Sequence, residues 1–178
     1  SSPPKAPPEA APEVTVETIV ARLQPIQELA MLKVSISGIV NASQPGKHWW
    51  QGESRLVLLV RGEALYAVDL SGLGVDLKDN RIVVSLLPPR VSDAWVDVES
   101  SQIWRRDVGR FRDPNQPAIE SKAWQSATEM VRNGADSPDH QAVAKMRTKQ
   151  KIVDLVHEID PTLNVEIQWQ EPPAVQSA

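Results

Sequence analysis

Residues 32–40 read LKVSISGIV, and their hydrophobic period of two is the clearest structural signal in the chain. Successive side chains of a β-strand point to opposite faces of its sheet. The apolar side chains of Leu32, Val34, Ile36 and Val40 would therefore share one face, and the polar side chains of residues 33, 35 and 37 the other. We predict a half-buried strand that Gly38 interrupts, through either a bulge or a close crossing.

The segments that follow indicate further strands. Residues 41–54 are polar and rich in turn-forming residues, so we predict a loop there. Residues 56–60 are continuously apolar, which is typical of a central strand buried on both faces. Residues 64–70 have two interpretations: a second strand after a turn at 61–63, or the same strand bent at Gly62.

A hairpin and two shorter strands are predicted next. Residues 75–77 and 81–87 are apolar segments on either side of the polar turn 78–80, a pattern that favours a hairpin. Short strands are expected near residues 95–98 and 102–106.

Helical spacing appears at the N-terminus and in the second half of the chain. Residues 15–23 predict a short helix. A second helix has one apolar face and would end at Gly134 as its C′ glycine. The residues of that face are Ala123, Ala127, Met130 and Val131, flanked by Ile119 and Trp124.

A third helix is predicted to begin after Ser137 as its N-cap and to run to about Ile159, before Pro161. Its predicted apolar face consists of Ala142, Val143, Met146, Val153 and Val156, widened by Ile152, Leu155 and Ile159. Residues 165–169 alternate again and predict a closing strand.

These elements predict the α+β class: a mainly antiparallel sheet with a short N-terminal helix, two packed C-terminal helices and a closing strand at the C-terminus. A single domain is expected over residues 15–170. It would follow a Pro/Ala-rich spacer at residues 1–14 and precede a disordered tail at residues 171–178, since neither end contains enough large apolar residues to form a core.

The composition excludes several classes of protein. The chain has 178 residues, a formal net charge of −4 and 41% hydrophobic residues, which are ordinary values for a globular domain. It contains no cysteine, so no disulfide stabilises it. No apolar run reaches the ~18 residues that would cross a membrane. The acidic balance argues against nucleic acid as a partner, and no cofactor is expected because phosphate-binding and dinucleotide motifs are absent.

Several strings, taken in order, resemble the domain-of-unknown-function family 4230, which is found mainly in bacteria. They are the segment 19–29 with the strand 32–40, GEALYAVDL at residues 62–70 and RIVVSLLPP at residues 81–89, followed by Ala-rich helices and a closing strand. The resemblance covers about residues 16–167. Ala67 stands where the family pattern leads us to expect glycine, and Pro89 directly follows Pro88.

The resemblance implies no known activity and no catalytic residues. Members of the family are often anchored in a membrane by one N-terminal helix, with this domain outside the cytoplasm. The chain does not begin with Met and opens with the Pro/Ala-rich spacer. We therefore expect a periplasmic or extracellular domain, tethered through an N-terminal segment that precedes this sequence.

The tryptophans are the most informative local feature, because the chain has six of them against one Tyr and one Phe. Trp95, Trp104, Trp124 and Trp169 lie in periodic segments and are predicted to be in or beside the core. Trp49 and Trp50 follow His48 in a polar segment. They are either an exposed pair that contacts a partner, a glycan or a lipid surface, or one capping residue and one residue lying on the surface.

Four arginines form a second candidate contact for an anionic partner: Arg105, Arg106, Arg110 and Arg112. Asp107 and Asp113 dilute this basic run. The alternative interpretation is therefore a solvated loop whose charges pair with one another.

Neither histidines nor carboxylates form a recognisable catalytic or metal motif. The three histidines, His48, His140 and His157, are not at metal-binding spacing. Asp69, Asp76, Asp79 and Asn80 lack the spacing of a calcium loop, and turn formation accounts for the last two. An enzyme of an unrecognised class would require a pocket in which a histidine meets a carboxylate.

The sequence thus leads to two hypotheses of function. The first is a non-enzymatic extracytoplasmic domain that acts by protein interaction or assembly, with an unknown protein partner or with itself. The alternative is a glycan- or lipid-binding module that uses Trp49 and Trp50, with His48 beside them.

Overall fold

The computed structural model describes residues 2–4, 15–23, 26, 28–109 and 117–172. The predicted spacer at residues 1–14 and the predicted tail at residues 171–178 lie outside these ranges, apart from residues 2–4, 171 and 172.

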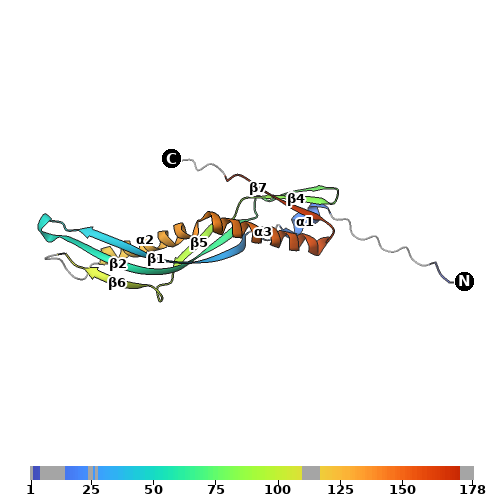
Figure 1. Cartoon of the computed structure of the whole chain (residues 1–178). Coiled ribbons are helices and arrows are strands. Elements are labelled where there is room, and N and C mark those ends of the chain that lie inside the picture. Colours follow the sequence, from blue (N-terminus) through green and yellow to red (C-terminus); the bar gives the residue numbers. More distant parts are fainter. Residues whose placement is uncertain (1, 5–14, 24–25, 27, 110–116, 173–178) are drawn as a thin grey trace.

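A long curved hairpin forms the first sheet, sheet A (Figure 1). Its strands are β1 (Glu28–Pro45) and β2 (Glu53–Asp69), paired antiparallel along their whole length. The other edge of β2 pairs antiparallel with two shorter strands in succession, β6 (Gln102–Asp107) near the hairpin tip and β5 (Arg90–Val96) further along. The strand β1 is therefore an edge of sheet A.

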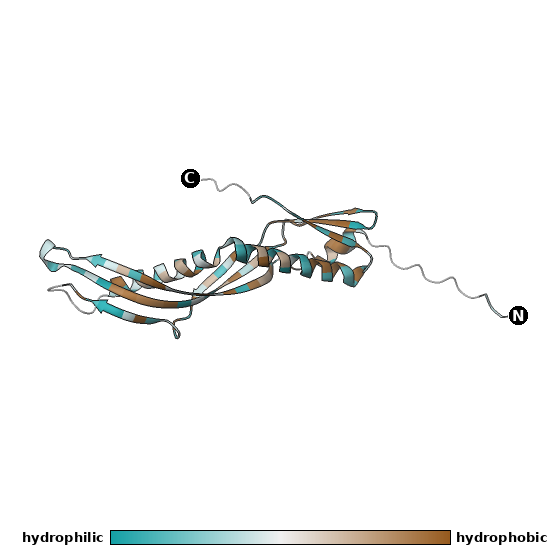
Figure 2. Cartoon of the chain, in the orientation of Figure 1, coloured by the Kyte–Doolittle hydropathy of each residue, from teal (hydrophilic) through white to brown (hydrophobic). Residues whose placement is uncertain are grey.

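The hairpin is longer than the sequence predicts. Apolar and polar residues alternate along both long strands (Figure 2), and in β1 this continues past Val40, with Ala42 buried between the exposed Asn41 and Ser43. The predicted loop at 41–54 is therefore wrong except for a short connection around residues 46–52. Of the two interpretations of residues 64–70, the single continuous strand is confirmed, since β2 runs through Gly62 without a turn.

One helix, α2 (Pro117–Ala135), covers one face of sheet A. It lies close to the strands because two glycines leave room for it. A Cβ atom on Gly38 would lie 2.7 Å from Met130 Sδ, and one on Gly62 would lie 2.5 Å from Val131 Cγ2. Of the two roles expected for Gly38, close crossing is thus the correct one. Gly134 lies inside α2, so its predicted role as the C′ glycine is wrong.

A second, smaller sheet lies at the other end of the molecule (Figure 1). The predicted hairpin is confirmed as β3 (Gly74–Lys78) and β4 (Arg81–Leu86), and the closing strand β7 (Asn164–Trp169) pairs parallel with β4. A second core includes residues of this sheet and of the helices α1 (Val16–Leu23) and α3 (Pro138–Ile159). Its fully buried members are Ile19, Leu23, Val68, Ile82, Val84, Leu86, Ile152 and Val156.

The predicted α+β class with mainly antiparallel pairing is confirmed, although the strands form two sheets. Ser137 is the N-cap of α3 and accepts a hydrogen bond from His140 N at 3.2 Å. The predicted face of α3 is wrong in its first half, where Ala144 and Thr148 are buried and Met146 is 65% exposed. Ala144 in the first half of α3 belongs to the core of sheet A, whereas Ile152 and Val156 in its second half belong to the second core, so two different neighbours set the buried face of the helix.

Tyr66 connects β2 with the junction between α2 and α3. The side chain is fully buried. Its hydroxyl donates to Ala135 O at 2.8 Å and accepts from Ser137 N at 3.3 Å, so it satisfies backbone groups at the end of one helix and before the next. Burial raises the pKa of the Tyr66 hydroxyl, and the Asp136 carboxylate raises it further.

The close approach at Gly62 leads to a first prediction. We expect Gly62→Ala to lower the free energy of unfolding by about 1–3 kcal/mol, because the added methyl group meets Trp95 O and Val131 Cγ2, each at 2.5 Å. Gly72→Ala is the matched control, since a Cβ atom on Gly72 would have no neighbouring atom within 4 Å and should leave stability nearly unchanged. Urea titration measures both variants, and equal stability of the two would contradict this account of the packing.

Tyr66 leads to a second prediction, on alkaline pH. Because the folded-state pKa is raised, the stabilisation is present below the unfolded pKa of about 10 and is lost as the pH rises through the folded-state pKa. Tyr66 is the only tyrosine, so its ionisation can be followed alone by ultraviolet absorbance. We expect an absorbance step that coincides with unfolding, and a Tyr66→Phe protein that is less stable by about 1–2 kcal/mol at neutral pH but lacks this alkaline loss. A normal tyrosine titration in the folded protein would contradict the prediction.

Candidate contact site at the hairpin tip

The connection between β1 and β2 is a short, well-defined turn rather than a long loop. Gly46 N donates to Gly52 O at 3.0 Å and closes its base. Within it, residues Trp49–Gln51 form one 3-10 turn, and the Gln51 side-chain oxygen accepts from His48 N at 3.2 Å. Gly52 has φ 69°, in the region that favours glycine. The turn therefore holds the two tryptophans at a defined place.

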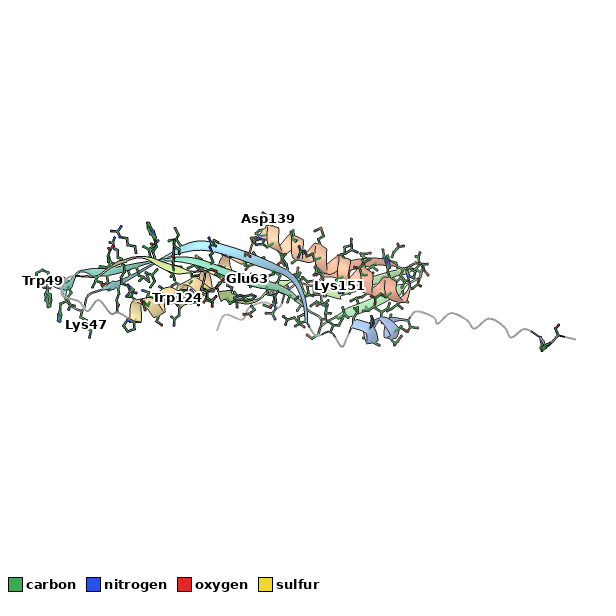
Figure 3. The ribbon with its side chains drawn as sticks, turned by 90° about the horizontal axis from the view of Figure 1, so that it is seen from below. Lys47, Trp49, Glu63, Trp124, Asp139 and Lys151 are labelled. Atoms are coloured by element: carbon green, nitrogen blue, oxygen red, sulfur yellow. The ribbon has the colours of Figure 1, made fainter. Side chains whose placement is uncertain are left out.

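Both tryptophans of the tip lie outside the core. Trp49 is 94% exposed and Trp50 is 46% exposed. The His48 and Trp50 rings stack with centroids 5.3 Å apart and an angle of 2° between their planes. Figure 3 shows Trp49 and Lys47 at the extreme end of the molecule. The structure thus places His48, Trp49 and Trp50 at the tip beside Lys47, while their role in contact stays a prediction.

The four arginines do not form one surface in the part of the chain that the structure describes. Arg105 projects beside Asp107, with 3.2 Å between its Nε and the carboxylate. Arg106 instead forms an ion pair with Glu120 of α2. Arg110 and Arg112 lie outside the described residues. Each described arginine of this set is therefore paired with an acidic side chain of the same chain. Both lie on strand β6 rather than in the solvated loop of the alternative interpretation, and the partner of Arg106 lies outside the basic run.

The sequence analysis predicted a polar face for residues 32–40 but missed the hollows on the face of sheet A that α2 does not cover. Shallow hollows run along it and are lined by residues of β1, β2, β5 and β6 together with the turn at 97–101. Asp97 organises this turn by accepting from Ser100 Oγ at 2.6 Å, and hydrogen bonds to Ser100 lower the pKa of its carboxyl. The polar residues at alternate positions of β1 were a signal that this face is open.

Two tryptophans of this region differ from expectation. Trp104 is 66% exposed, so its predicted place in or beside the core is wrong. It lies at the irregularity where β6 shifts its register against β2 and has no partner there. This local loss of pairing explains why the alternation of apolar and polar residues did not predict which side chains of β6 are buried. Trp95 is 36% exposed on β5, opposite Glu63. Trp124 and Trp169 are half-buried, as expected of residues beside a core.

The histidines have local structural partners. His140 Nδ1 lies 2.9 Å from Ala135 O, and His157 Nε2 lies 2.9 Å from Leu163 O. The four pockets that lie on the open face of sheet A and beside Pro88 have no histidine in their lining. Asp69 accepts from Ser71 N at 2.9 Å and so serves a turn. Among the described residues, no three histidine or acidic side chains are placed to hold a metal ion.

Comparison with known families agrees with the strings quoted above. The family model described as "Protein of unknown function (DUF4230)" matches residues 21–167. The chain belongs to this family. The match spans all of sheet A, both long helices and the small sheet up to residue 167 of β7. No curated protein and no solved structure matches the chain.

Proposed function

We propose that this member of DUF4230 is a non-enzymatic, extracytoplasmic domain that acts by contact, through protein interaction or assembly. It would be tethered to a membrane by an N-terminal segment that precedes this sequence. One observation carries the proposal: an almost fully exposed tryptophan, Trp49, stands at the apex of a long hairpin. Exposed aromatic side chains are enriched where proteins meet partners.

The arrangement of the two ends supports a role in bridging. Helix α1 begins at Val16 and lies at the end of the molecule opposite the hairpin tip (Figure 1). The strand β1 alone has 18 residues, which at about 3.3 Å each extends roughly 60 Å. A chain attached before α1 would therefore present Trp49 far from its point of attachment.

The chemistry of the described residues also supports contact rather than catalysis. His140 and His157 are engaged with backbone carbonyls, and His48 stacks on Trp50 at the exposed tip. A general acid or base requires a group that can reach a bound substrate in a sheltered position.

In the part of the chain covered by the structure, no helix is both long and apolar enough to cross a membrane.

A third prediction tests location and contact together. The chain has no cysteine, so Lys47→Cys in the full-length protein, with any cysteine outside this chain changed to serine, introduces one thiol at the tip and leaves Trp49 in place. We expect a membrane-impermeant maleimide that carries a photo-crosslinker to label it in intact bacteria, or in bacteria whose outer membrane alone has been permeabilised, and to yield a discrete protein adduct after illumination.

Val98→Cys is the matched control for this experiment, because Val98 is 65% exposed and lies in the turn after β5, away from the tip. It should be labelled equally well without giving the same adduct. Labelling that requires lysis would contradict the extracytoplasmic location, and identical adducts from both positions would contradict a specific contact at the tip.

The tip geometry also favours one form of the alternative function, binding to a lipid surface. Trp49 and Trp50 lie beside Lys47, and tryptophan with a nearby cation is a combination found at membrane interfaces. The two rings stand at an apex rather than in a groove, which suits shallow insertion better than the enclosing of a sugar ring. A glycan would instead use the parallel His48–Trp50 stack as a flat platform.

A fourth prediction separates this alternative from protein contact. If the tip inserts into lipid, the wild-type chain should sediment with vesicles of mixed zwitterionic and anionic phospholipid. The Trp49→Ala/Trp50→Ala double variant should then bind at least about tenfold more weakly, because two large aromatic surfaces are lost. Trp104→Ala is the control, since that side chain is 66% exposed elsewhere on the sheet. Equal binding by the double variant and the wild type would exclude the lipid function.

A further inference from the structure

The outer edge of β1 is a long row of backbone groups that no other described strand covers. Register pairs connect β1 to β2 from Glu28↔Asp69 to Pro45↔Glu53, and among the described strands none pairs with the other side of β1. In an antiparallel pair, every second residue of an edge strand directs its N–H and C=O away from its neighbour. Such a row is a template for another strand.

This edge carries few of the charges that usually protect an edge strand. Lys33 is the only charged residue between Leu32 and Pro45, and its ammonium pairs with Glu63 at 3.2 Å. Helix cations reach the edge at two distant points, Arg147 to Met31 O at 3.4 Å and Lys122 to Ser43 O at 3.5 Å. The span between them has no charged side chain except Lys33.

Apolar side chains remain partly uncovered along the same span. On the open face of the sheet, Ile39 is 59% exposed. On the helix side, Ile36 is half-buried, as is Met130, which lies over Gly38. A strand added to this edge would cover Ile39. If the sheet of that strand has a helix packed on it, as sheet A has α2, this helix would cover the side of α2.

We propose that residues 35–43 of β1 pair antiparallel with the same residues of a second copy of this chain, with Ile39 facing its own counterpart. This inference rests on the proposed role in assembly and names the partner. It would join two sheets A into one continuous sheet across a two-fold axis perpendicular to the sheet.

Charge and pattern favour a second copy over another partner. In this register Lys33 faces the uncharged Pro45, so no like charges meet, and Ser35 faces Ser43. Odd-numbered residues face odd-numbered ones, which keeps the open faces together and places both α2 helices on the same side of the joined sheet. The β1 edges of two copies thus match each other in length, in polarity and in the face of the sheet that stays open.

Sedimentation analysis of the 178-residue chain tests the inference. We expect a reversible dimer, whose dissociation constant rises on the order of tenfold or more in Ile39→Lys, because two ammonium groups would then meet at the axis. Trp104→Lys is the matched control, since Trp104 is 66% exposed on β6, which pairs with the side of β2 away from β1, and this variant should dimerise like the wild type.

Crosslinking tests the register without relying on a charged substitution. In a chain that otherwise lacks cysteine, Ile39→Cys should give covalent dimers with a short bifunctional thiol reagent. Ser43→Cys should not, because residue 43 faces residue 35 of the other copy and lies roughly 26 Å along the strand from its own counterpart.

Two results would overturn the inference. One is a monomer at every concentration tested, which leaves a contact of the tip with a different protein intact. The other is a dimer that survives Ile39→Lys and is lost in Trp49→Ala/Trp50→Ala, which would place self-association at the tip. Both outcomes separate the failure of the edge pairing from the failure of the proposed function.

Discussion

The fold depends on the close packing of α2 against sheet A. At Gly38 and Gly62 the helix side chains occupy the space that a Cβ atom would need. The buried positions of α2 are mostly alanine, so the helix backbone lies near the strands along its whole length. This contact covers one face of the long hairpin and gives a two-stranded ribbon, marginal by itself, a core of its own.

Because α2 covers only one face, the rest of the architecture leaves surfaces open. The opposite face of sheet A remains accessible, β1 remains an edge, and the tip around Trp49 extends beyond the core. Tyr66 bonds to the backbone where α2 ends and α3 begins, and α3 then runs on to the small sheet. The result is an elongated domain with a second core at one end and an aromatic tip at the other (Figure 1).

Much of the fold could be predicted from local patterns. Period two identified β1 and β7, a polar turn between two apolar segments identified the β3–β4 hairpin, and the Ser137-Pro138 pair marked the start of α3 correctly. The errors share a cause. The residues at 41–54 look like a loop because polar side chains on an open sheet face resemble those of a turn, and Met146 looks apolar enough for a core that lies elsewhere. Which face a helix buries depends on neighbours distant in sequence.

By itself the sequence determined the class of the fold, the family, the absence of disulfides and the presence of a tryptophan pair, since these follow from residue types and short-range periodicity. Only the tertiary structure decided that the pair stands at the apex of a long hairpin, that Arg105 and Arg106 have separate acidic partners, and that β1 lies at an edge. Exposure and strand order arise from contacts between distant segments, and a local pattern does not contain them.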